Sequence, residues 1–125
     1  MRTSGTTCNG KAMPAVAPVS WNAQLADAAA RHSRDMASNG FLSHTGSDGS
    51  RAGARIGAAG FTGQWTGENI AAGYSSINAV IAGWLSSTAG HCEGIMNPRA
   101  TYIGASAYAN PGTQHRVYWT LVQSR

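Results

Sequence analysis

The stretch GHCEGIM, residues 90–96, places His91, Cys92 and Glu93 side by side, and each of these side chains can do chemistry. Cys92 could be a nucleophile with His91 as its base, one end of a disulfide, or a metal ligand. Neighbouring residues at a helix end point in different directions, and a nucleophilic cysteine needs its base across a cleft. The residues therefore favour a disulfide from Cys92 to Cys8, with a free reactive thiol as the alternative.

His44, His91 and Glu68 form a second candidate group. Both histidines are expected in loops just beyond helix ends, where imidazoles can converge on a cleft and bind zinc or another transition metal. Two imidazoles leave part of the metal shell to water or a ligand, and their wide sequence separation differs from the close pair in HExxH. Glu68 has little charge nearby in the sequence and is the candidate general base. No GxSxG nucleophile motif occurs.

The remaining ionisable residues have structural interpretations. His32 lies on the apolar face of the first predicted helix, which indicates a core histidine hydrogen-bonded to a neighbour. Asp27 and Asp35 lie away from that face and are expected to be solvated. Asp48 lies in a Gly/Ser-rich loop and is expected to form an Asx-type turn.

The first element that must position these residues is a helix over 20–40. Ser20 or Asn22 can cap its N-terminus. Its apolar face repeats with helical spacing, and Gly40 fits the C′ position, which requires a positive φ. Residues 1–19 show neither a helical nor a strand period and are expected to form an arm.

The middle of the chain carries weaker signals. Phe41 and Leu42 are expected to enter the core after the first helix. Ser50 can cap a short helix over 51–60. Residues 61–73 are interrupted by glycines and predict irregular chain with a short strand at most.

A third helix is predicted to begin at Ser75 or Ser76 and to end at Gly90. Its apolar residues follow the spacing of one helix face: Ile77, Val80, Ile81, Trp84 and Leu85. Residues 110–113, NPGT, then predict a type II turn inside a C-terminal β-hairpin. Helices packed on a small antiparallel sheet indicate an α+β fold.

Composition limits the function classes. The chain has 125 residues, one ordinary domain, and only 11% of them are charged, against about 25% in an average globular protein. The net charge of +4 is spread along the chain without a basic cluster, so nucleic-acid binding is not indicated. No apolar stretch approaches a transmembrane length, and the first residues lack an apolar leader, so a leader is expected to be missing here.

The ordered segments AARHSRDMA, FLSHTG, GENIAAG, WLSSTAGHCEGIMNP and YIGASAY resemble the bacterial branch of the CAP superfamily, which groups cysteine-rich secretory, antigen 5 and pathogenesis-related proteins. The resemblance spans roughly residues 21–122. It implies secretion and a three-layer α–β–α sandwich with a small antiparallel sheet. It implies an N-terminal arm over 1–19, anchored by a disulfide, and a single CAP domain over 20–125.

The resemblance also implies a cleft lined by His44, Glu68 and His91. In similar proteins the paired histidines can hold a divalent metal, often zinc. It further implies a Cys8–Cys92 disulfide, with Glu93 as a solvated surface residue. This chain departs from many eukaryotic members, because Ser86 and Ser87 stand where those members have a second glutamate.

These features predict a secreted monomer whose His/Glu cleft binds a divalent metal, a small molecule or a component of the cell envelope, without established catalysis. One alternative is a zinc-dependent hydrolase with His44 and His91 as metal ligands and Glu68 as base. The other is an extracellular lipid or sterol binder, ranked lower because the sequence shows no apolar lid.

Overall fold

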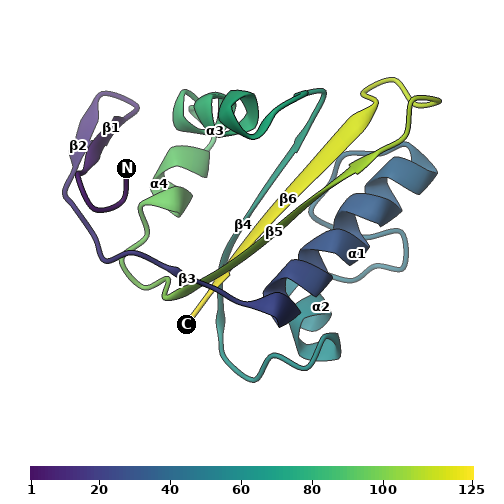
Figure 1. The fold of residues 1–125 in the computed structure, drawn as a ribbon, viewed down its shortest axis with the longest axis horizontal. Helices are drawn as coiled ribbons and strands as arrows, with labels where there is room; N and C mark the ends of the chain where they lie inside the picture. Colours follow the sequence, from purple (N-terminus) through teal and green to yellow (C-terminus); the bar gives the residue numbers. More distant parts are fainter.

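The computed structural model describes all 125 residues, and a four-stranded sheet separates two helical layers (Figure 1). The sheet has the order β3-β5-β6-β4. Helices α1 and α2 cover one face, and α3 and α4 lie toward the other. The bounds are β1 Thr6–Cys8, β2 Lys11–Met13, β3 Ser20–Trp21, α1 Ala23–Asn39, α2 Ala52–Ala58, β4 Trp65–Ala72, α3 Ile77–Leu85, α4 His91–Ile95, β5 Tyr102–Ala109 and β6 Val117–Ser124.

This architecture confirms the α+β class and the α–β–α layering. The sheet is mixed, however, because the short strand β3 pairs parallel with β5, whereas β5, β6 and β4 pair antiparallel. Strand β3 has only two residues and leads directly into the N-cap of α1 at Asn22. Such a short strand has no recognisable sequence pattern.

Helix α1 forms as its caps require. The Asn22 side chain accepts a hydrogen bond from the backbone N–H of Leu25, and Gly40 adopts the left-handed conformation at the C-terminus. Leu25 and Ala29 are fully buried against β6, where Val122 lies beneath them. A side chain at Gly104 of β5 would overlap the backbone of α1, so the helix lies directly on this strand.

The N-terminal arm is more ordered than predicted. Strands β1 and β2 form an antiparallel hairpin around Asn9 and Gly10. Both residues have a positive φ, as an Asn-Gly type I′ hairpin turn requires. The Asn-Gly pair was the available signal, but three-residue strands are too short to show a period.

The prediction of irregular chain with a possible short strand over 61–73 underestimated the strand, because β4 is an eight-residue edge strand paired with β6. Glycine lowers strand propensity, and Gly67 lies where the register shifts next to Trp65. Leu42 was also placed wrongly, since it is exposed whereas Phe41 packs against the core.

Several element ends differ from the predictions. The α3 helix has Ser76 as its N-cap but ends at Leu85, and Gly90 instead precedes α4. Ser50 does not cap α2, which has no side-chain cap. The turn after Asn110 is not type II, because Gly112 lacks a positive φ and donates its N–H to the Asn110 side chain.

Candidate functional site

His44 lies in the loop after α1 and contacts Glu68 on the edge strand β4. The His44 Nδ1 atom is 2.8 Å from Glu68 Oε1. The Glu68 side chain is 1% exposed, whereas that of His44 is 45% exposed. A carboxylate can only accept here, so a neutral His44 carries its proton on Nδ1 and turns the Nε2 lone pair away from Glu68.

Arg55 of α2 occupies the other oxygen of this carboxylate. Its Nη2 atom lies 2.8 Å from Glu68 Oε2 and also donates to the His44 carbonyl at 3.1 Å. The Arg55 and Glu68 side chains are 2% and 1% exposed, so the pair is buried. Burial by itself raises the pKa of Glu68, but the hydrogen bonds from His44 and Arg55 and the charge of Arg55 outweigh it and lower this pKa.

His91 is the first residue of α4, and hydrogen bonds hold both its ring and its backbone. Its Nδ1 atom lies 2.8 Å from Ser87 Oγ, and its carbonyl accepts a hydrogen bond from the Asn69 side chain on β4. Burial and the charge of His44 lower the pKa of His91, while Glu93 opposes this shift.

The three predicted residues line two different cavities. His44 and Glu68 line a hollow of about 230 Å³, and His91 lines another of about 320 Å³ together with Ser87 and Tyr74. No group of three or more His, Cys, Asp or Glu side chains has an arrangement that could hold a metal ion. The structure thus joins His44 to Glu68 directly, and a metal on His44 and His91 stays a prediction.

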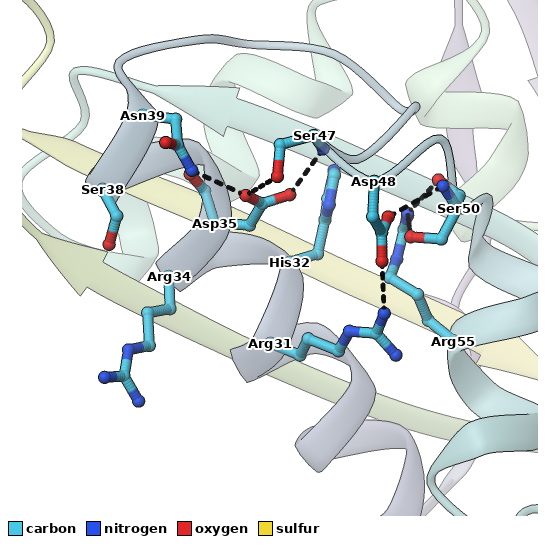
Figure 2. A pocket seen from close by; sticks show the side chains of 10 residues that line it. All are labelled: Arg31, His32, Arg34, Asp35, Ser38, Asn39, Ser47, Asp48, Ser50 and Arg55. Carbon is cyan, nitrogen blue, oxygen red and sulfur yellow. Dashed lines mark hydrogen bonds and ion pairs between the residues drawn. The ribbon is translucent and has the colours of Figure 1, made fainter.

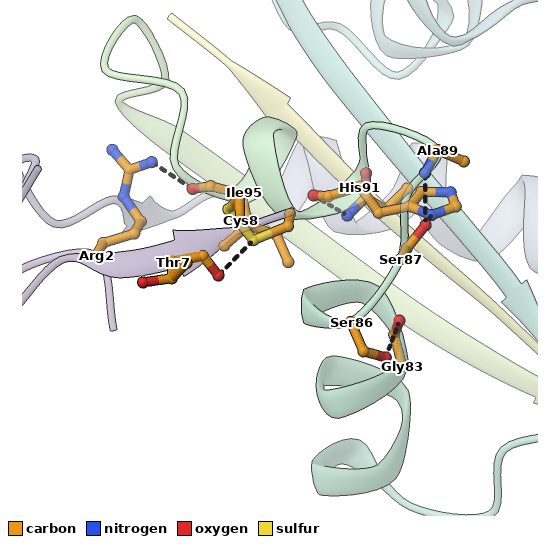
Figure 3. The surroundings of a disulfide bond; sticks show 11 residues. Arg2, Thr7, Cys8, Gly83, Ser86, Ser87, Ala89, His91 and Ile95 are labelled. Carbon is orange, nitrogen blue, oxygen red and sulfur yellow. Dashed lines mark hydrogen bonds between the residues drawn. A yellow bond between two sulfur atoms is a disulfide. The ribbon is translucent and has the colours of Figure 1, made fainter. Parts of the chain in front are cut away.

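The disulfide joins Cys8 to Cys92, with a Cα–Cα distance of 5.6 Å, and no free cysteine remains (Figure 3). This confirms the disulfide, and the free-thiol alternative was wrong. Because Cys92 follows His91 in α4, the bridge also holds the start of α4 against the β1–β2 hairpin.

Two acidic residues differ from their predicted surroundings. Glu93 is half-buried, and its Oε2 atom is buried without a hydrogen-bond partner, so the expectation of a solvated residue was wrong. Asp35 is not simply solvated, because it accepts hydrogen bonds from Ser47 and Asn39. Asp48 forms the expected Asx-type turn by accepting from the Ser50 N–H.

The loop that carries His44 is held by α1 and borders a polar hollow of about 420 Å³ (Figure 2). Asp35 contacts Ser47, and Arg31 pairs with Asp48 at 2.7 Å. His32 is fully buried as predicted, and its Nε2 lies 2.7 Å from the Ser43 carbonyl oxygen. These contacts fix both ends of the loop around His44.

Sequence reasoning missed Arg55 and Ser87 as partners of the site. Arg55 lies in a short segment of alanines and glycines, where one basic residue resembles an ordinary surface cation. Ser87 precedes His91 by four residues, but it lies in the connection between α3 and α4, so helical spacing does not relate the two. Neither the Arg55–Glu68 contact nor the Ser87–His91 contact follows a helical or strand spacing in the sequence.

The fold and the histidine-lined surface define a class of proteins, and sequence comparison identifies it. The profile of the cysteine-rich secretory protein family, CAP, matches residues 9–123. The chain therefore belongs to the CAP family. No helix is both long enough and apolar enough to cross a membrane.

Three known proteins are similar to this chain in sequence or fold. An extracellular SCP-domain protein from Bacillus anthracis has a TM-score of 0.73 and 31% identity over 88% of this chain and 35% of its own. An outer surface protein of Borrelia burgdorferi has a TM-score of 0.74 at 19% identity, over 88% of this chain and 79% of its own, and shares the fold. The uncharacterized membrane protein YlbC of Bacillus subtilis is 31% identical over 80% of this chain. This chain covers 29% of YlbC.

Proposed function

We propose that this domain is an extracellular binding module in which His44 and His91 present their Nε2 atoms to one divalent metal ion, with zinc the first choice. One observation supports the proposal most: the Nδ1 atom of each histidine already has a hydrogen-bond partner. This partner is Glu68 for His44 and Ser87 for His91. Metal-ligating histidines are commonly oriented in this way by a carboxylate or another polar group on the second nitrogen. Two imidazoles suit zinc, and water or a small ligand would complete the shell.

Within this proposal Glu68 is a positioning residue and not a general base. Both of its oxygens are hydrogen-bonded, its side chain is buried, and its pKa is lowered. A general base needs a free oxygen within reach of the proton that it removes. The buried carboxylate instead fixes the proton on His44 Nδ1 and keeps Nε2 available.

Zinc titration tests the metal site. Zinc that binds the native state raises the melting midpoint, and we expect this rise to be lost in His44→Ala and in His91→Ala. His115→Ala is the matched control, because His115 is exposed in the turn before β6. A rise that persists in both site variants, or no rise in the wild type, contradicts the proposal.

Glu68→Gln separates the binding module from the hydrolase. If Glu68 orients His44, this variant weakens zinc binding by about 10–100-fold, as is usual for such outer partners. If Glu68 is a base, zinc binding is kept and a hydrolytic activity of the wild type disappears. Zinc affinity by calorimetry and hydrolysis of ester and peptide substrates distinguish the two outcomes.

An apolar groove favours lipid binding as a second candidate function. A cavity of about 460 Å³ between α3 and the sheet is lined mainly by apolar side chains, with Trp21 and Ile77 more than 60% exposed. It shares Ile81 and Leu121 with a second cavity of about 370 Å³. No local sequence pattern marks this groove, because its walls come from four separate elements, β3, α3, β5 and β6.

The ligand that best fits this groove is a fatty acid. Arg2 lines the far cavity, and its guanidinium group donates to four backbone carbonyls but has no carboxylate partner. Binding of laurate, measured by calorimetry, should weaken in Ile77→Asn and in Arg2→Gln and should persist in His44→Ala. Equal laurate affinity in all three variants contradicts this candidate.

A further inference from the structure

The hollow beside His44 has features that metal binding does not use. We call it the Trp65 hollow, and its lining residues are His44, Arg51, Ala52, Gly53, Ala54, Trp65 and Glu68. Its volume of about 230 Å³ is below the roughly 300–1,000 Å³ of drug-sized ligand sites. It therefore has room for one small ring and not for a chain of several.

The hollow carries one uncompensated positive charge. Arg51 donates to Thr45 Oγ1 at 3.0 Å, and none of its nitrogens forms a salt bridge with a carboxylate. The only carboxylate in the lining, Glu68, is already paired with Arg55. The free N–H groups of Arg51 thus favour an anion, and a guanidinium group matches the geometry of a carboxylate.

Trp65 supplies an unused aromatic face. Trp65 is the first residue of β4, and its side chain is 47% exposed. The indole stacks on no other ring, and its nitrogen forms no hydrogen bond. The register shifts between Trp65 and Gly67, as at a β-bulge, while Trp65 itself still pairs with Ser124 of β6. A ring face carries partial negative charge and attracts the weakly positive C–H groups of a ligand.

His44 adds a hydrogen-bond acceptor. Since Nδ1 is committed to the Glu68 carboxylate, the neutral imidazole offers its Nε2 lone pair, which accepts from a hydroxyl group. One cation, one aromatic face and one acceptor thus line a space for a single ring. A ligand that satisfies all three has a carboxylate, a C–H face and hydroxyl groups.

We propose that the Trp65 hollow is a binding site for an acidic sugar, a single pyranose ring that carries a carboxylate. The carboxylate pairs with Arg51, the C–H face of the ring packs on Trp65, and one hydroxyl donates to His44 Nε2. The site shares His44 with the proposed metal site but requires no metal, so the two proposals can fail independently.

Glucuronate is the probe, titrated into the intact chain in the presence of a chelator and followed by calorimetry and by the indole N–H signals in NMR spectra. We expect glucuronate to shift the Trp65 signal, which Trp65→Phe assigns. Glucose lacks the carboxylate and acetate lacks the ring, so each should bind about tenfold more weakly or worse. Inorganic phosphate tests for a simple anion site.

Matched variants locate the binding. Arg51→Gln and Trp65→Leu should each weaken glucuronate binding at least about tenfold. Arg99→Gln and Trp21→Leu, which remove an exposed arginine and an exposed tryptophan outside this hollow, should leave it unchanged. All four variants are surface changes, and unaltered melting midpoints confirm that they fold.

Three results would overturn the proposal: no binding of glucuronate, equal affinity for acetate or phosphate, or full binding by Arg51→Gln. The zinc response is measured in the same variants and is expected to survive in Arg51→Gln and Trp65→Leu. Loss of the zinc response in the wild type, with glucuronate binding intact, would contradict the metal proposal alone.

Discussion

Glu68 is the residue on which the geometry around His44 depends. A buried carboxylate is costly unless hydrogen bonds and an opposite charge compensate for the lost water. Arg55 supplies the charge and His44 supplies the second hydrogen bond, so these three side chains hold one another in place. The same contacts connect α2, β4 and the loop after α1.

Arg55→Ala should lower the free energy of unfolding by about 3–5 kcal/mol, because it leaves the buried Glu68 charge unpaired. Arg31→Ala is the control, since its partner Asp48 is exposed and such surface pairs contribute little to stability. Urea unfolding measures both. An equal loss of unfolding free energy in the two variants would show that the buried pair stabilises the protein no more than the surface pair.

His32 predicts how stability changes with pH. Burial and the charge of Arg55 lower its pKa below the ordinary 6.5, and its buried Nδ1 has no acceptor for a second proton. The unfolded chain therefore binds more protons than the folded one just below pH 6.5, and stability falls as the pH decreases through this range. NMR titration of His32 checks this, and a pKa at or above 6.5 would contradict it.

At the scale of elements, the contact between α1 and β5 positions the loop that carries His44. Gly104 permits this contact, because any side chain there would overlap the backbone at Leu25 and Ala26. The helix thereby approaches the sheet more closely than side chains on both elements would allow.

Gly104→Ala should destabilise the protein by about 1–3 kcal/mol, the usual effect of overpacking a core. Gly57→Ala is the matched control, because Gly57 lies in α2 with open space around its Cβ position. That change should stabilise slightly, by about 0.5–1 kcal/mol, since alanine is the better helix former. Thermal and urea unfolding compare the two, and equal effects would contradict the close-packing argument.

At the scale of the whole molecule, two parts differ in how they are held. The central strands and α1 share an extended buried surface, whereas the β1–β2 hairpin is joined to the remainder through the cluster of Cys8, Cys92 and Met96. The disulfide closes a loop with a sequence separation of 84. The disulfide is thus the covalent link between the hairpin and the start of α4, and hydrogen bonds from Arg2 to the carbonyls of Ile95 and Asn97 add to it.

Replacement of both Cys8 and Cys92 by serine should lower the free energy of unfolding by at most about 4.5 kcal/mol in the chain-entropy estimate for a loop of this length. Amide protection should fall first in β1, β2 and α4 and last in β5 and β6. Hydrogen exchange measures the order. Uniform loss of protection would show that the bridge stabilises the whole domain equally.

The sequence by itself determined the helix α1 with its caps, the C-terminal hairpin, the α+β class and the family. These depend on short-range patterns: apolar residues at helical spacing around Leu25, alternation along β6, and a set of motifs in fixed order. The disulfide was also predictable, because only two cysteines exist.

Only the tertiary structure decided which residues meet at the site. The contact of Glu68 with Arg55 and His44 joins three elements, and the distance between residues along the chain carries no information about such a contact. The edge strand β4 forms despite weak strand propensity, because β6 offers it a complete set of hydrogen-bond partners. Local patterns select helices and turns, but long-range pairing and burial fix where each side chain points.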